Sequence, residues 1–478
     1  MRCGPEGSRI VERMPSGLHG SVPQDYRPSL MPRILFYPLA EVGHVNGTFK
    51  LARQLRARGH DIRYLSLPDV EEHVRSHGWD FTPVFGELYP KGMLEAADAV
   101  MNSDAPFKKK KQVVDDLRRR TKTYFPEVLF GRDFEALLQE SRADLLLADA
   151  TFPLPALTAR RLGIPAAIFS TTLPLRADAA VPPLVSPAPP PHGWWSRLKV
   201  RATWPWLSNN WGFLGGKFLR ELVQEVSRRS PELGKLCDFR SHLQHGPYVN
   251  LPTLIACGAE FDFPRASLEN LHYIGPGVEL ERADEPLPPE MEQDSRPLLY
   301  CSLGSLGHRA LPHRPFFQAV LDAVARRPDW RLLMGVGRSL DVAGFRIPPN
   351  ATVVPFASQL PALRRASVML THGGLNSVKE CICLGVPMLV FPTGFDQPGN
   401  GARVVHHGLG LMGNIRKATP ETISSMLDTV AGDPGYRARV RAMQERFLAA
   451  DASNRGVELV ERLITKGRAS APPRETPS

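Results

Sequence analysis

The chain has 478 residues, which is enough for two or three domains of ordinary size. Hydrophobic residues make up 42% and charged residues 23% of it, a globular composition that excludes a mainly disordered, collagen-like or disulfide-scaffold protein. The formal net charge is +10, and such a basic balance suits phosphorylated ligands, nucleic acids or anionic membranes without choosing among them.

The first half of the chain alternates between predicted strands and helices after an unstructured start. Residues 1–30 are rich in Pro, Gly, Ser and charge, so we expect a disordered leader and no secretory signal. The predicted elements that follow are a strand at 33–37, a loop at 43–47, a helix from Asn46 to Gly59 and a strand at 61–65. This order is a βαβ unit with parallel strands, and it recurs with strands at 144–148 and 166–170.

One segment interrupts this alternation, and we interpret residues 178–220 as an insertion in the first half. Residues 182–191 hold six prolines, and five of the seven tryptophans follow within eighteen positions. The segment is either a packed surface pair of helices, or an apolar wall for a hydrophobic ligand or a membrane-contact face. The basic run at 108–120 is interpreted as a solvated helix face.

A second series of strands and helices begins near residue 297. Its predicted elements are a helix at 316–326 and strands at 297–302, 331–334, 352–354, 368–370 and 388–391. Residues 281–296, rich in Pro and Glu, are predicted to be the linker between the halves. We therefore expect an α/β protein with domains at 31–280 and 297–465, followed by a disordered tail at 466–478.

The most informative motif runs from Thr371 to Glu380, directly after a predicted strand. His372, two glycines and Asn376-Ser377 open a helix, and free N–H groups at a helix N-terminus bind anions such as phosphate. Glu380 lies one turn further on, where its carboxylate can accept the hydroxyls of a ribose. The alternative is an ordinary glycine-rich turn before a capped helix.

Two neighbouring segments add polar and aromatic groups to this motif. Asp396 and Gln397 follow the next strand, at the sheet edge where open α/β folds bind ligands, and can bracket the hydroxyls of a sugar. Upstream, Phe356 can stack on a flat base, and the region of Gln359 can hydrogen-bond the edge of that base.

The string from Phe356 to Gln397 resembles the nucleotide-sugar signature of the family-1, UDP-glycosyltransferase superfamily. The resemblance extends over nearly all of residues 31–465. In Tyr300-Cys-Ser-Leu-Gly-Ser305 and in Asp396-Gln-Pro-Gly399, the chain is similar to bacterial macrolide-type and zeaxanthin-type glucosyltransferases. The resemblance implies the GT-B fold, with two Rossmann-like parallel-sheet domains that face a central cleft.

The resemblance also implies site residues. The diphosphate would lie on Ser305, His372, Asn376 and Ser377, the ribose on Glu380, and the sugar hydroxyls on Asp396 and Gln397. The full donor site that it implies is Gly304, Ser305, Phe356, Ala357, Gln359, His372, Gly374, Asn376, Ser377, Glu380, Asp396 and Gln397. Plant members of the family carry Trp where Phe356 and Leu375 stand here.

The same family places its catalytic base just after the first strand, and His44 matches that position, with Asp149 as its partner carboxylate. This assignment is chemically sensible, because an acceptor hydroxyl must lose its proton as it attacks and imidazole is suited to accept it near pH 7. A carboxylate behind the imidazole fixes its tautomer and stabilises the imidazolium. A single histidine in a loop is otherwise more often structural.

No metal or cofactor is predicted. The chain has no Asp-x-Asp triplet, and its six cysteines are scattered without metal-ligand spacing, which favours the reducing cytoplasm as its compartment. A diphosphate leaving group would then be stabilised by the helix N-terminus and its neighbouring donors.

Several other functions fit the sequence less well. Gly408 to Gly413 spells G-x-G-x-x-G, but it ends a helix instead of opening one, which argues against a dinucleotide-dependent oxidoreductase. A glycosidase needs two carboxylates around a sugar bond, and no such pair is evident near His44. The alternatives that stay open are a non-catalytic nucleotide-sugar-binding protein and a nucleotide-sugar epimerase.

The sequence thus predicts an inverting, metal-independent glycosyltransferase that moves a hexose, expected to be glucose, from UDP to a hydroxyl of a hydrophobic acceptor. The acceptor class is a natural product of macrolide, carotenoid or polyphenol type. We expect a monomer or homodimer that lies in the cytoplasm and does not bind nucleic acid. A peripheral membrane contact is compatible with this prediction.

Overall fold

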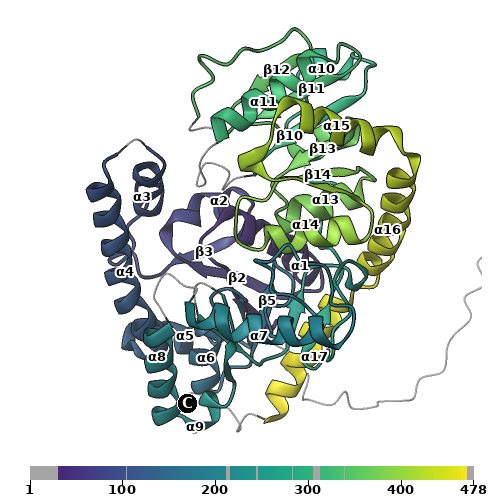
Figure 1. The fold of residues 1–478 in the computed structure, drawn as a ribbon. Helices are drawn as coiled ribbons and strands as arrows, with labels where there is room; N and C mark the ends of the chain where they lie inside the picture. The colour runs from purple at the N-terminus through teal and green to yellow at the C-terminus, as the bar shows by residue number, and fades with distance from the viewer. Residues whose placement is uncertain are drawn as a thin grey trace, which may run out of the picture. The chain divides into compact units, whose positions relative to one another are not determined.

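The computed structural model describes residues 31–103, 105–210, 216–243, 246–282, 284–304, 313–337 and 340–470. The predicted leader at 1–30 and the last eight residues of the predicted tail lie outside the described residues. From Pro32 onward the chain forms one compact unit. In Figure 1 its first sheet runs from purple to teal and its second is green.

The first sheet has seven strands, all parallel, in the order β3-β2-β1-β4-β5-β8-β9. The strands are β1 (Arg33–Tyr37), β2 (Asp61–Ser66), β3 (Asp80–Pro83), β4 (Leu145–Asp149), β5 (Ala166–Ser170), β8 (Thr253–Ile255) and β9 (Leu271–Tyr273). β1 and β4 lie side by side, with Ile34 opposite Leu145, so their carboxyl ends meet at one edge. The predicted parallel sheet is confirmed.

The helices of this half cover both faces of the sheet. They are α1 (Val42–Ala57), α2 (Glu71–Ser76), α3 (Met93–Asn102), α4 (Phe107–Phe130), α5 (Arg132–Glu140), α6 (Leu154–Arg161), α7 (Trp194–Asn210), α8 (Gly216–Arg229) and α9 (Pro231–Gly234). Alternate side chains of β1 belong to different cores: Ile34 packs with α1, whereas Leu35 packs with residues of α4 to α6. The antiparallel hairpin β6 (Cys237–Leu243) and β7 (Gly246–Val249) follows α9.

The second sheet has six parallel strands in the order β12-β11-β10-β13-β14-β15. They are β10 (Leu298–Ser302), β11 (Arg331–Gly335), β12 (Ala351–Val354), β13 (Ala366–Thr371), β14 (Met388–Val390) and β15 (Gly410–Met412). Its helices are α10 (Pro289–Glu292), α11 (His313–Ala325), α12 (Gln359–Arg365), α13 (Leu375–Cys383), α14 (Gln397–His406), α15 (Pro420–Gly432), α16 (Pro434–Ala452) and α17 (Arg455–Ser470). The predicted linker is packed, because Leu287 and Met291 are buried in a core to which both halves contribute side chains.

The last helix differs from its prediction. α17 continues to Ser470, five residues into the expected tail, and its buried Val457, Val460 and Ile464 join Ile34 and Phe49 in the core of the first half. The apolar spacing of these three residues puts them on one side of a helix, which therefore covers the first sheet although the chain has already built the second. Within the described residues, no helix is both long and apolar enough to cross a membrane.

Candidate active site

His44 and Asp149 meet at the carboxyl edge of the first sheet. α1 begins at Val42, so His44 lies in its first turn and not in the predicted loop at 43–47. Asp149 is the last residue of the neighbouring strand β4. The Nδ1 atom of His44 is 2.8 Å from Oδ2 of Asp149. The other oxygen of Asp149 accepts hydrogen bonds from the backbone N–H and hydroxyl of Thr151, at 2.8 and 2.6 Å, which fixes the carboxylate.

The electrostatics of this pair stabilise an imidazolium. Burial is the largest single influence and lowers the pKa of His44, but the charge and hydrogen bond of Asp149, together with more distant carboxylates, outweigh it and raise this pKa to about 9. Glu41 and Asp396 act more weakly in the same direction. Burial raises the pKa of Asp149, yet the contacts with His44 and Thr151 bring it below its usual value. Because Nδ1 of His44 is hydrogen-bonded to Asp149, Nε2 is the ring nitrogen that can take a proton from a ligand.

Thr171 is a third member of this cluster that the sequence analysis did not identify. Its hydroxyl lies 3.0 Å from Nδ1 of His44, just beyond the end of β5. Gly47 makes room for it, because a Cβ at Gly47 would lie 2.6 Å from Cγ2 of Thr171. The detectable signal was its position, since a polar residue directly after β5 lies at the same sheet edge as Asp149.

The N-terminus of α13 is open toward the loop that precedes it. Gly374 is the N-cap residue, and no side chain caps the helix. The His372 ring packs between two glycines, since a Cβ at Gly304 or Gly374 would lie 2.4 or 2.5 Å from ring atoms of His372. The first N–H groups of α13 and the imidazole therefore form the kind of cradle that binds an anion such as a diphosphate.

Glu380 is held by donors from two other elements. Its carboxylate accepts hydrogen bonds from Nη1 of Arg282 at 2.7 Å and from Nε2 of Gln359 at 2.5 Å. Gln359 also contacts the hydroxyl of Ser377, at 3.2 Å. The structure thus brings three predicted donor residues together and adds Arg282, from the predicted linker, which the sequence analysis missed.

Asp396 and Gln397 begin α14 next to the α13 loop. The Gln397 side-chain oxygen accepts hydrogen bonds from Thr393 and Gly394, so the loop before α14 fixes the carbonyl end of this amide. Asn400 donates to Asp396 at 2.9 Å and to the Gly373 carbonyl at 3.0 Å, which ties the two loops together. Burial raises the pKa of Asp396.

The remaining predicted donor residues lie around this core. Phe356 is 58% exposed at the surface. The Ala357 carbonyl accepts a hydrogen bond from Tyr300 on β10. Ser305 lies outside the described residues.

Two contacts connect the donor-side helix with the first half. Asn376 donates to the carbonyl of Gly43 at 2.7 Å, and buried Lys379 donates to the carbonyl of Ala256 at 2.8 Å. The residue before His44 is therefore bonded directly to the helix whose N-terminus forms the anion cradle. Asn376, which was expected on the diphosphate, has this second partner in the structure.

The chain is similar to known sugar-transfer enzymes. Residues 244–448 match the family described as UDP-glucoronosyl and UDP-glucosyl transferase. A zeaxanthin glucosyltransferase of Pantoea ananas is 24% identical over 433 residues, which cover 89% of this chain and 94% of that protein. The solved structure of the glycotransferase of kitacinnamycin has a TM-score of 0.64 at 23% identity and covers 91% of this chain and 99% of its own. The family match lies within residues 244–448, and together with these relatives it supports a family-1 glycosyltransferase with the GT-B fold.

A second relative, the NDP-glycosyltransferase YjiC of Bacillus subtilis (strain 168), is 23% identical over 439 residues, which cover 89% of this chain and 95% of that protein. The predicted resemblance to this family, the GT-B fold and the enzyme class of glycosyltransferase are thus confirmed. The substrates are a nucleotide-sugar donor and a small-molecule acceptor.

The proline- and tryptophan-rich insertion of this glycosyltransferase is packed at one tryptophan and exposed at others. Trp204 is buried, and its indole N–H donates to the carbonyls of Asp178 and Val181, so it packs the segment onto the protein and is no part of an open wall. Trp194 and Trp195, in contrast, are exposed. Trp211 lies outside the described residues.

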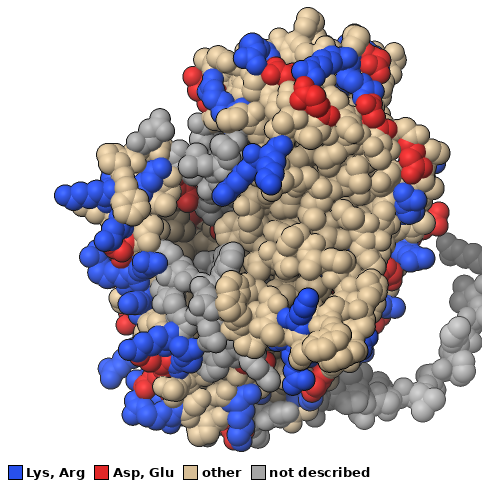
Figure 2. Space-filling view, in the orientation of Figure 1, with Lys and Arg blue, Asp and Glu red and all other residues tan. Residues whose placement is uncertain are grey.

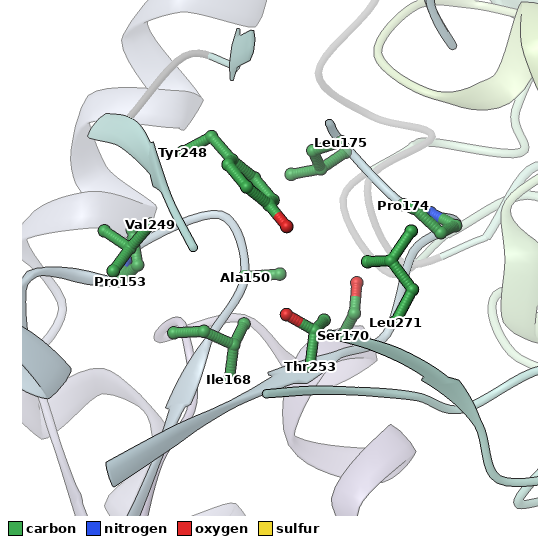
Figure 3. A pocket seen from close by; sticks show the side chains of 10 residues that line it. All are labelled: Ala150, Pro153, Ile168, Ser170, Pro174, Leu175, Tyr248, Val249, Thr253 and Leu271. Carbon is green, nitrogen blue, oxygen red and sulfur yellow. The ribbon is translucent and has the colours of Figure 1, made fainter. Parts of the chain in front are cut away.

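A small cavity lies beside the end of β4 (Figure 3). The hydroxyl groups of Tyr248, Ser170 and Thr253 point into it, and Ala150 and Leu175 supply apolar walls. Its volume of about 10 Å³ is close to what one water molecule needs, so it holds no acceptor in this conformation. Among the described residues, no group of three His, Cys, Asp or Glu side chains could hold a metal ion.

Proposed function

We propose that this glycosyltransferase transfers a hexose, preferably glucose, from UDP to a hydroxyl of a hydrophobic small molecule, with inversion at the anomeric carbon and without a metal ion. The observation that carries the proposal is the His44–Asp149 pair at 2.8 Å, bonded through Gly43 to the helix that presents the anion cradle. The base, His44, and the anion cradle at the N-terminus of α13, where the leaving group would bind, are thereby held next to each other.

The proposed chemistry follows from these groups. Nε2 of His44 takes the proton of the acceptor hydroxyl as its oxygen attacks the anomeric carbon, while Asp149 stabilises the imidazolium. The bond from the sugar to the diphosphate breaks, and its electron pair remains on the diphosphate. A single displacement of this kind comes from the face opposite the leaving group, which inverts the configuration.

The proposed donor contacts use the second half. The α13 N-terminus and His372 face the diphosphate, and their donors can stabilise the departing negative charge in the role that a divalent cation has in other enzymes. Glu380 accepts the ribose hydroxyls once Arg282 and Gln359 release it. Asp396 and Gln397 bind the sugar hydroxyls, and Phe356 stacks on the base.

The acceptor class is supported by the relatives. One is a zeaxanthin glucosyltransferase, and a structural neighbour is the glycotransferase of kitacinnamycin, so hydroxylated hydrophobic natural products are the class to test first. All described cysteines, of which Cys381 and Cys383 are buried neighbours, are free thiols, and we propose the cytoplasm as the compartment.

The test is a product assay with UDP-glucose and dTDP-glucose against carotenoid, macrolide, polyphenol and sterol acceptors. We expect UDP release, a β-linked product from the α-linked donor by NMR coupling constants, and full turnover in EDTA. His44→Ala should lower kcat roughly 10²–10⁴-fold while UDP binding persists. A retained anomeric configuration, or turnover that EDTA abolishes and magnesium restores, would contradict the mechanism. UDP binding without any product would favour the non-catalytic alternative.

A further inference from the structure

Helix α7 exposes an apolar face although it belongs to a packed segment. Trp194, Trp195, Leu198 and Trp206 are 65%, 62%, 51% and 62% exposed. At 100° per residue these four side chains fall within an arc of about 120°. The rings of Trp194 and Trp195 stack at 3.7 Å, so they form one continuous apolar surface.

Buried residues on the opposite side of α7 keep the exposed apolar face turned toward solvent. Val200 and Trp204 are buried there, and the Trp204 indole is bonded to two backbone carbonyls, of Asp178 and Val181, at 3.1 Å each. The helix therefore cannot rotate its exposed tryptophans inward without breaking a buried hydrogen-bonded anchor.

The charged side chains of α7 itself are all basic. Arg197, Lys199 and Arg201 are exposed on α7 at both borders of the apolar arc. No Asp or Glu occurs anywhere between Asp178 and Glu221. In Figure 2, which has the orientation of Figure 1, the surface over α7 is mostly uncharged, with blue side chains and a few red ones at its lower border.

Tryptophan beside arginine and lysine, without acidic residues, is the composition of a helix that lies in a lipid headgroup layer. The indole rings suit the boundary between headgroups and acyl chains, and cations near an anionic surface each add attraction. A protein partner would not require that the segment between Asp178 and Glu221 lack acidic residues, whereas an anionic phospholipid surface would repel such residues. The charge pattern therefore favours a phospholipid surface over a protein as the partner of α7.

We propose that α7 binds this enzyme peripherally to anionic membranes, with Trp194, Trp195, Leu198 and Trp206 at headgroup depth and Arg197, Lys199 and Arg201 on lipid phosphates. The inference does not depend on the transfer chemistry. Where the proposed function also holds, the contact gives the enzyme access to acceptors dissolved in the bilayer.

The test is co-sedimentation of the full chain with vesicles of phosphatidylcholine alone and of equal parts phosphatidylcholine and phosphatidylglycerol. We expect binding to the anionic vesicles that falls with salt, together with a blue shift of tryptophan fluorescence. Trp194→Ala/Trp195→Ala should weaken binding at least tenfold, and Arg197→Gln/Arg201→Gln should weaken it and reduce its salt dependence.

Matched controls separate α7 from general electrostatics. Arg118→Gln/Arg119→Gln removes the same charge from exposed positions of α4, and Leu268→Ala trims an exposed apolar side chain elsewhere. Both should bind vesicles as the parent does, and thermal unfolding should show that all variants are folded. Absence of vesicle binding by the parent, equal losses in the α4 and α7 variants, or an α7-dependent dimer without lipid binding would overturn the proposal.

Discussion

The raised pKa of His44 makes a quantitative prediction about pH. A base must be deprotonated to act, and with a pKa of about 9 only about 1% of His44 is neutral at pH 7. We therefore expect kcat/KM to rise about tenfold per pH unit from pH 6 to 8 and to level off near pH 9. An acceptor alcohol without its own ionisable group is required, so that the profile reports the enzyme.

Asp149→Asn should move this profile toward acid. The carboxylate is the largest of the influences that raise the pKa of His44, and burial, which lowers it, remains after the substitution. The midpoint should fall from about 9 to 6.5 or below, a change of about 3 kcal/mol in the stability of the imidazolium. The plateau should also drop, roughly 10²-fold or more, because the neutral base is weaker and its tautomer is no longer fixed.

The assay is UDP release at saturating donor across pH 5.5 to 10, in buffers of constant ionic strength. Asp433→Asn, at the N-cap of α16 and far along the chain from the pair, is the matched control and should keep the parental midpoint. A parental midpoint near 6.5, or an Asp149→Asn profile that coincides with the parental one, would refute the reasoning.

Three further predictions concern the donor site and the insertion. Glu380→Ala should weaken UDP binding by about 1.5–3 kcal/mol in calorimetry, since the ribose loses a charged acceptor; unchanged affinity would count against that role. Arg282→Ala should tighten UDP binding several-fold, because it removes the donor that occupies the Glu380 carboxylate in the free enzyme; weaker binding would mean that Arg282 contacts the nucleotide itself. Trp204→Ala should lower the free energy of unfolding by about 3–5 kcal/mol in chemical denaturation, because this ring is buried and bonded to backbone. The donor KM of the folded fraction should stay unchanged. Unaltered stability together with a raised acceptor KM would show instead that Trp204 contributes to an apolar wall for the acceptor.

Local patterns were sufficient to predict two halves with parallel strands, whereas the GT-B fold was predicted from the resemblance to a known family. The apolar runs at 33–37 and 144–148 form parallel strands, and each is followed by a helix that leads to the next parallel strand, β2 or β5. The pairing of β1 with β4 joins strands that are not consecutive in the chain. The approach of His44 to Asp149 follows from this pairing, since both stand at the ends of adjacent strands. Their catalytic role stays a prediction.

Contacts that depend on tertiary placement could not be predicted. Nothing in the linker sequence indicates that Arg282 reaches Glu380, because ninety-eight positions separate them and neither periodicity nor a motif connects them. The start of α1 at Val42 was missed because Asn46 offers a plausible cap, whereas the structure begins the helix at extended Glu41 without a side-chain cap.

The place of α17 has a consequence for the order in which the protein is made. Val457, Val460 and Ile464 cover apolar side chains of β1 and α1, which leave the ribosome long before α17 is synthesised. During translation the first half therefore has an uncovered hydrophobic face until α17 emerges, and this face is open to aggregation during that time. A fragment that ends before α17 would keep that face exposed, so the first half should aggregate when expressed alone and regain solubility when the α17 peptide is supplied in trans.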